Sequence, residues 1–118
     1  MLSTGKISYY EKGISNETII CLHGIGGDNE SFEPQLNGLS DKYRIISWNM
    51  PGYKGSKPLE KYSFENLSIA LNEFLLNLNL EKVNLMGQSI GGMLAQEFYY
   101  HYPKKVKSLI LILSPQLS

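Results

Sequence analysis

The chain has 118 residues, of which 42% are hydrophobic and 19% are charged. This length and composition are typical of a single globular domain and exclude an intrinsically disordered chain. Eleven basic residues balance eleven acidic ones, so no electrostatic field favours nucleic acid or an anionic membrane as a partner. One cysteine cannot form an internal disulfide, and no apolar run has the length of a signal peptide or a membrane span. We therefore expect a cytoplasmic protein.

Two kinds of apolar pattern alternate along the chain. Continuous apolar or β-branched runs predict buried strands, and segments with a helical period predict helices between them. Strands are expected at residues 6–11, 18–22, 44–48, 82–86 and 106–113, and helices at 31–39, 63–78 and 91–102. Ser63 is expected to cap the second helix and Pro103 to end the third. The alternation predicts an α/β fold, a doubly wound, mostly parallel sheet between two helical layers, formed by residues 1–118 as one unit.

A Gly-x-Ser-x-Gly motif, Gly87-Gln88-Ser89-Ile90-Gly91, follows the strand expected at 82–86. In a nucleophile elbow the chain turns so tightly that the serine is strained, and glycine is needed two residues before and after it. The turn would expose the Ser89 hydroxyl and leave the Ile90 amide at a helix N-terminus, where it can donate to an oxyanion. Gly92 is expected to let that helix approach the sheet closely. A Gly-Ser turn without chemistry is the alternative, and the flanking strand and helix favour the elbow.

Two further segments, together with the elbow, resemble the α/β-hydrolase superfamily. His23-Gly24-Ile25-Gly26-Gly27 resembles its His-Gly oxyanion loop, and residues 48–56 resemble the loop commonly written Asp-x-Pro-Gly-x-Gly-x-Ser. The resemblance implies that the Ile25 amide is the second oxyanion donor and that His23 shapes the loop. The second segment departs from the family pattern twice, because Asn49 replaces the usual aspartate and Lys54 a small residue.

The run from residue 86 to residue 93 is similar to that of cofactor-free ester and lactone hydrolases, such as the enol-lactonase and haloperoxidase-like branches. This similarity implies a small ester or lactone as substrate, Ser89 as the nucleophile, an acyl-enzyme intermediate and no cofactor. A non-catalytic binding module and an acyltransferase on the same fold are the alternatives, and the oligomeric state is left open. No metal site is expected, because two histidines and one cysteine lack the spacing of ligands.

The catalytic acid and base are not identified. In the superfamily they follow the serine along the chain, whereas Glu97 and His101 are the sole carboxylate and histidine after Ser89. His101 should lie about 18 Å along the helix from the elbow, and Glu97 should face solvent. The family resemblance gives His23 a loop-shaping role, and Asp28 is expected to have an entry-loop or helix-capping role. We therefore expect residues 1–118 to be the N-terminal part of a single hydrolase domain and to be inactive alone. The unbroken apolar run of the last strand indicates that the rest of the domain covers it on both faces and both sides, and that without this cover it presents an apolar edge to solvent.

Overall fold

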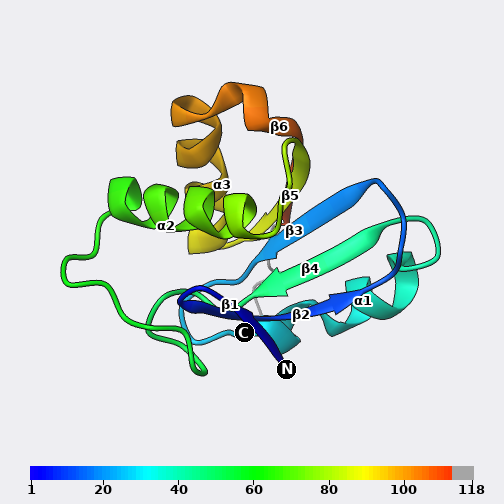
Figure 1. Ribbon diagram of the computed structural model, residues 1–118, viewed down its shortest axis with the longest axis horizontal. Helices are drawn as coiled ribbons and strands as arrows, with labels where there is room; N and C mark the ends of the chain where they lie inside the picture. Colours follow the sequence, from blue (N-terminus) through cyan, green and yellow to red (C-terminus); the bar gives the residue numbers. More distant parts are fainter. Residues whose placement is uncertain (113–118) are drawn as a thin grey trace, which may run out of the picture.

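The computed structural model describes residues 1–112 and forms a three-layer α/β/α arrangement (Figure 1). Its sheet has the strand order β1-β2-β4-β3-β5-β6. The strands are β1 Leu2–Thr4, β2 Ile7–Lys12, β3 Thr18–Leu22, β4 Arg44–Trp48, β5 Val83–Gln88 and β6 Val106–Ile112. The helices are η1 Asn29–Phe32, α1 Glu33–Leu39, α2 Phe64–Asn77, α3 Ile90–His101 and η2 Pro103–Lys105. The predicted α/β class and mostly parallel sheet are confirmed.

The sheet is parallel in its centre and antiparallel at one edge. Strands β4, β3, β5 and β6 run parallel to one another, whereas β2 is antiparallel to both β1 and β4. The short strand β1 was not predicted, because three residues carry no periodic pattern. It forms because Gly5, at φ +58°, turns the chain back onto β2.

The central strands are buried on both faces, as the unbroken apolar runs predict. All five residues of β3 are buried. Ile20 and Leu22 pack in the cluster that faces α2 and α3, whereas Ile19 and Cys21 pack in the cluster that faces α1. Because successive residues of a strand point to opposite faces, this division places α1 on one side of the sheet and α2 and α3 on the other (Figure 1).

The helix boundaries follow from local hydrogen bonding. Oγ of Ser63 accepts a hydrogen bond from the Asn66 amide at 3.0 Å, so the predicted cap of α2 is confirmed. The helix expected at 31–39 is divided into η1 and α1, and Pro34 lies in the first turn of α1, where its missing N–H does no harm. Helix α3 ends at His101, and Pro103 begins the short helix η2.

Strand β6 is the last strand of the sheet and leaves apolar side chains uncovered, since Ile110 and Leu111 are 38% and 45% exposed in the described part of the chain. This exposure agrees with the expectation of an apolar edge strand whose cover is not supplied by residues 1–118. Residue 113, the expected end of the strand, lies outside the described residues.

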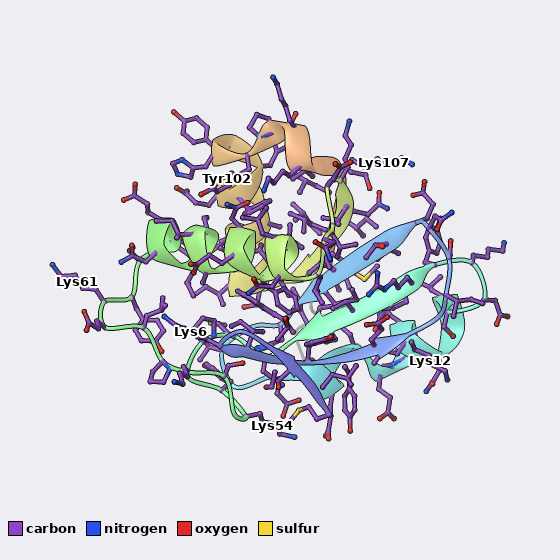
Figure 2. All side chains as sticks on the ribbon, in the orientation of Figure 1. Lys6, Lys12, Lys54, Lys61, Tyr102 and Lys107 are labelled. Atoms are coloured by element: carbon purple, nitrogen blue, oxygen red, sulfur yellow. The ribbon has the colours of Figure 1, made fainter. Side chains whose placement is uncertain are left out.

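Within residues 1–112 no helix is long and apolar enough to cross a membrane. Lys61 extends outward from the surface (Figure 2).

Candidate active site

Ser89 lies at the sharp turn between β5 and α3. Its backbone angles are φ 57° and ψ −124°, a strained conformation for a residue with a side chain, at a cost of about 1–3 kcal/mol. Strand β5 ends at Gln88 and α3 begins at Ile90, so the turn occupies this single residue. Ser89 is exposed, whereas Gly87 and Gly91 on either side of the turn are buried. The geometry is that of a side chain lifted out of the sheet edge.

The glycines around Ser89 differ in how strictly they are needed. A Cβ atom on Gly87 would lie 2.5 Å from the carbonyl oxygen of Gly91, and one on Gly91 would lie 2.0 Å from that of Leu22. Both distances are far too short for real atoms. A Cβ atom on Gly92 would lie 3.5 Å from its nearest neighbour, an ordinary contact. The expectation for Gly92 is therefore wrong, because Gly91 is the residue that lets α3 approach the sheet.

The loop after β3 passes directly beside Ser89. A Cβ atom on Gly24 would lie 2.9 Å from Cβ of Ser89 and 3.4 Å from its Oγ. The loop then turns through Gly26, at φ +83°, and the Gly27 amide donates to the Gly24 carbonyl at 3.0 Å. This tight turn presents Ile25, whose side chain is 73% exposed, at its tip.

Backbone amides with no partner inside a helix are available at the start of α3. Ile90 is the first residue of this helix, and the first N–H groups of a helix have no acceptor within it. The positive end of the helix dipole lies at the same point. Residues 25 and 90, the two predicted oxyanion donors, line one common pocket, so the fold brings the two segments together.

His23 connects two loops beneath this turn. It is fully buried, with Nε2 2.9 Å from the Met50 amide and Nδ1 2.8 Å from the Gly24 carbonyl oxygen. Because the amide can only donate, Nε2 carries no proton and Nδ1–H donates to Gly24. Burial lowers the pKa of His23, although the Gly24 hydrogen bond and the Asp28 charge act in the opposite direction. Both ring nitrogens are occupied, so this histidine shapes the loops and is not positioned as a general base.

Asn49 and Lys54, the two departures from the family pattern, belong to one hydrogen-bond network. The buried Asn49 amide donates to Oγ of Ser8 at 2.8 Å, and Oγ of Ser8 donates to the Lys54 carbonyl at 2.7 Å. Ser56 Oγ donates to the Asn49 carbonyl at 2.7 Å. An ionised aspartate at position 49 would have no hydrogen to donate to Ser8. Asparagine suits position 49 because its amide can donate to Oγ of Ser8, whose own hydrogen is donated to the Lys54 carbonyl.

The ammonium group of Lys54 joins the loop after β4 to the segment that follows the oxyanion loop. Its Nζ lies 3.1 Å from Oδ2 of Asp28 and 3.4 Å from Oε2 of Glu30. Asp28 also caps η1, since its Oδ1 accepts from the Glu30 amide at 2.8 Å. Burial alone would raise the pKa of Asp28, but the Glu30 N–H and the Lys54 ammonium together lower it. The capping role expected for Asp28 is confirmed, and the lysine bridge is an addition to it.

The remaining candidate groups lie elsewhere. His101 is the last residue of α3, and its Nε2 is 2.8 Å from Oε2 of Glu97. A helix of this length rises about 18 Å, so the pair lies at the far end of α3 from Ser89. Burial raises the pKa of Cys21 to about 12, which keeps the thiol protonated. The described residues contain no group of three or more side chains that could hold a metal ion.

A family model described as alpha/beta hydrolase fold matches residues 17–118. The chain belongs to the alpha/beta hydrolase fold family. The match includes the turn at Ser89, the loop after β3 and the loop after β4, which are the three segments that the sequence motifs identify.

Several members of this hydrolase family are similar to the chain. It is 34% identical over 94 residues to a poly(3-hydroxyalkanoate) depolymerase of Ectopseudomonas oleovorans, covering 79% of this chain and 33% of that protein. It is 30% identical over 115 residues to an (E)-2-((N-methylformamido)methylene)succinate hydrolase of Acinetobacter baylyi, covering 94% and 43%. A solved marine microorganism esterase superposes with a TM-score of 0.86 at 33% identity, covering 92% and 41%. The chain spans 29–43% of the length of the curated relatives it matches.

Proposed function

We propose that this α/β-hydrolase is a serine hydrolase that cleaves small carboxylic esters or lactones through Ser89. The observation that carries the proposal is the strained, exposed Ser89 beside Gly24 at the N-terminus of α3. Strain of this kind persists only when the surrounding structure enforces it, and it gathers at functional sites. The hydrolases and the esterase among its relatives support the same reaction class.

The proposed reaction has two steps. Oγ of Ser89 forms a bond to the ester carbonyl carbon while its proton passes to a base, and the bond to the alcohol oxygen breaks as the base gives this proton to the leaving alcohol. Water then releases the acid and restores the serine hydroxyl. The negative charge on the carbonyl oxygen in each step would be held by the backbone amides of Ile25 and Ile90.

We further propose that the catalytic acid and base lie outside residues 1–118. Both nitrogens of His23 are occupied by loop contacts, and His101 pairs with Glu97 at the end of α3. The 118-residue chain alone is therefore expected to show negligible turnover. A preformed oxyanion site without a triad still accelerates hydrolysis by about 10³–10⁴-fold over water in enzymes of this kind.

Addition of imidazole to the 118-residue chain tests the proposal, because it supplies a base to an exposed serine. The chain would be incubated with 4-nitrophenyl acetate with and without imidazole, and acetylation would be located by peptide mass spectrometry. Ser89 should gain an acetyl group in an imidazole-dependent manner. The Ser89→Ala variant should not gain it, and a Ser3→Ala variant at an exposed serine of β1 should behave as the unchanged chain does.

Two outcomes would overturn these statements separately. A chain in which Ser89 is never acetylated, even with imidazole, would not be a serine hydrolase. Rapid Ser89-dependent turnover without imidazole would show that the base lies within residues 1–118.

A further inference from the structure

A pocket of about 440 Å³ opens beside the turn at Ser89. It lies between the loop after β3, the loop after β4 and the first turns of α2. Met50, Pro51 and Leu67 are its buried lining residues, with Met50 and Leu67 5% and 7% exposed, and Tyr53 and Phe64 are partly buried against the same core. Its volume falls in the range of small-molecule sites, about 300–1,000 Å³.

The lining of this pocket offers little to a charged ligand. Among residues 1–112, none of those that line it is an aspartate, glutamate, lysine, arginine or histidine. The hydroxyl of Tyr62 donates to the Pro51 carbonyl at 3.0 Å and accepts from the Leu59 amide at 3.2 Å. Oγ of Ser63 is used as the cap of α2. A charged group placed here would lose its hydration without gaining a partner, which is costly.

The position of the pocket relates it to the reacting carbonyl. Ile25 and Ile90, whose amides are the proposed oxyanion donors, both line it. A substituent of a carbonyl held between these two amides would therefore enter this pocket directly.

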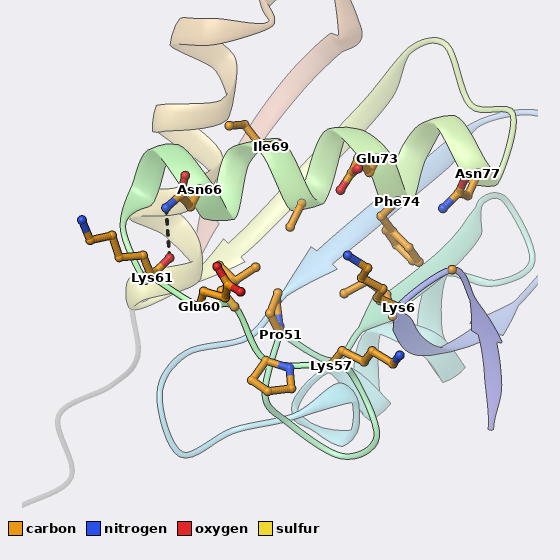
Figure 3. Close-up of a pocket in the computed structure, with 15 residues that line it drawn as sticks. Lys6, Pro51, Lys57, Glu60, Lys61, Asn66, Ile69, Glu73, Phe74 and Asn77 are labelled. Carbon is orange, nitrogen blue, oxygen red and sulfur yellow. Dashed lines mark hydrogen bonds between the residues drawn. The ribbon is translucent and has the colours of Figure 1, made fainter.

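A second pocket provides a contrast. It has a volume of about 530 Å³ and lies between α2 and the turn before β2. Lys6, Lys57 and Glu73 are among its lining residues, and Figure 3 shows these charged side chains around it. Because charges of both signs surround it, this second pocket is not suited to a hydrocarbon group.

Resting on the proposed function, we propose that the pocket between Ile25 and Leu67 binds an uncharged hydrocarbon substituent of the substrate ester. The substrate class is then an ester with one apolar chain or ring, on either the acyl or the alcohol side. Each buried methylene should tighten binding about fourfold.

The binding experiment uses the 118-residue chain with Ser89→Ala, so that no reaction interferes. Ethyl acetate, ethyl butanoate and ethyl hexanoate would be titrated while the amide signals of Ile25, Phe64 and Ile90 are followed by NMR. From butanoate to hexanoate, which adds two methylenes, the affinity should increase about sixteenfold. Hexyl acetate, an isomer of ethyl hexanoate, reports which side of the ester occupies the pocket, because the better-placed isomer should bind more tightly.

Matched charge substitutions locate the binding site. Ile25→Glu places a carboxylate at the pocket at a residue that is 73% exposed, and Ile69→Glu makes the same change at a residue of α2 that is 46% exposed and lies outside this pocket. The first variant should weaken ethyl hexanoate binding about tenfold or more, and the second should leave it unchanged. Thermal melting of both variants checks that they fold.

The proposal is overturned if affinity does not depend on chain length, or if both glutamate variants bind ethyl hexanoate equally. This failure is distinct from failure of the proposed function, since binding is read without the Ser89 hydroxyl. If binding depends on chain length but Ser89 is never acetylated, the proposal for the pocket stands and the proposed serine hydrolase function is refuted.

Discussion

Nε2 of His23 accepts a hydrogen bond from the Met50 amide at 2.9 Å, across 27 positions of sequence. The same ring contacts the Gly24 carbonyl through Nδ1. One buried side chain therefore sets the position of the loop beside Ser89 relative to the floor of the apolar pocket. Because the arrangement needs a neutral ring with the proton on Nδ1, protonation of His23 would break it.

The stability of the chain should fall in mild acid because of His23. Burial lowers the pKa of His23 below its ordinary value of 6.5, so the unfolded chain takes up this proton at a higher pH than the folded chain. The contribution of His23 to the free energy of unfolding is then complete above about pH 6.5 and decreases as the pH falls below this value. Urea unfolding at about pH 7.5 and about pH 5.5 would measure the loss.

The variant His23→Gln tests the assignment of this pH effect. It should be less stable than the unchanged chain at neutral pH, because the bridge between Gly24 and Met50 is lost, and it should lose less on acidification. His101→Gln should keep the full acid sensitivity. Asp28 and Glu17 also have lowered pKa values, but their carboxylates take up protons in more acidic solution than about pH 5.5. They therefore do not contribute to the change between about pH 7.5 and about pH 5.5. Undiminished acid sensitivity in His23→Gln would contradict the assignment.

Two neighbouring glycines of α3 should respond in opposite ways to alanine. Gly91→Ala forces a Cβ atom to within 2.0 Å of the Leu22 carbonyl oxygen, so we expect a loss of about 3 kcal/mol or more in the free energy of unfolding. Gly92→Ala makes an ordinary contact at 3.5 Å, and the helix propensity of alanine should add up to about 1 kcal/mol. Denaturant titration of both variants measures the contrast, and equal losses would refute it.

The bridge from Lys54 to Asp28 should hold the turn beside Ser89. We expect Lys54→Gln to speed hydrogen exchange of the Gly27 amide, which donates to the Gly24 carbonyl within this turn. Asp28→Asn should have a similar effect, since asparagine keeps the helix cap but loses the charge. The two effects should not add in the double variant, because they remove the same interaction.

Salt and a neighbouring lysine provide the controls for this bridge. The effect of Lys54→Gln should shrink at about 1 M salt, where exposed charges are screened within about 3 Å. Lys57→Gln changes a lysine of the same loop that makes no ion pair with the described residues, and it should leave exchange at Gly27 unchanged. If Lys57→Gln and Lys54→Gln act alike, the bridge has no special role.

The thiol of Cys21 should be unreactive while the chain is folded. Its side chain is fully buried, and burial raises the pKa of the thiol to about 12. A disulfide reagent such as dithionitrobenzoate should therefore react at neutral pH only when the chain unfolds. The reaction rate should rise with urea in parallel with the unfolding signal, and immediate reaction in buffer would place the thiol at the surface instead.

Local patterns were sufficient to predict the central part of the fold. The strands at 18–22 and 44–48 have the predicted bounds, because an unbroken apolar run is a property of neighbouring residues. The caps at Ser63 and Asp28 were predicted for the same reason. The strand β1 was not, because its pairing depends on a turn at Gly5 rather than on its own three residues.

The spacing of three motifs in the sequence was enough to identify the family and to locate the turn at Ser89 and the loop at 23–27. The contacts that position these groups arise between distant parts of the chain, such as Asn49 with Ser8, 41 positions apart. No local pattern encodes such a pair, since the antiparallel strands β2 and β4 come side by side only when the sheet forms. Only the packed structure therefore showed that α3 approaches the sheet at Gly91 rather than at Gly92, that His23 contacts Met50, and that Lys54 pairs with Asp28.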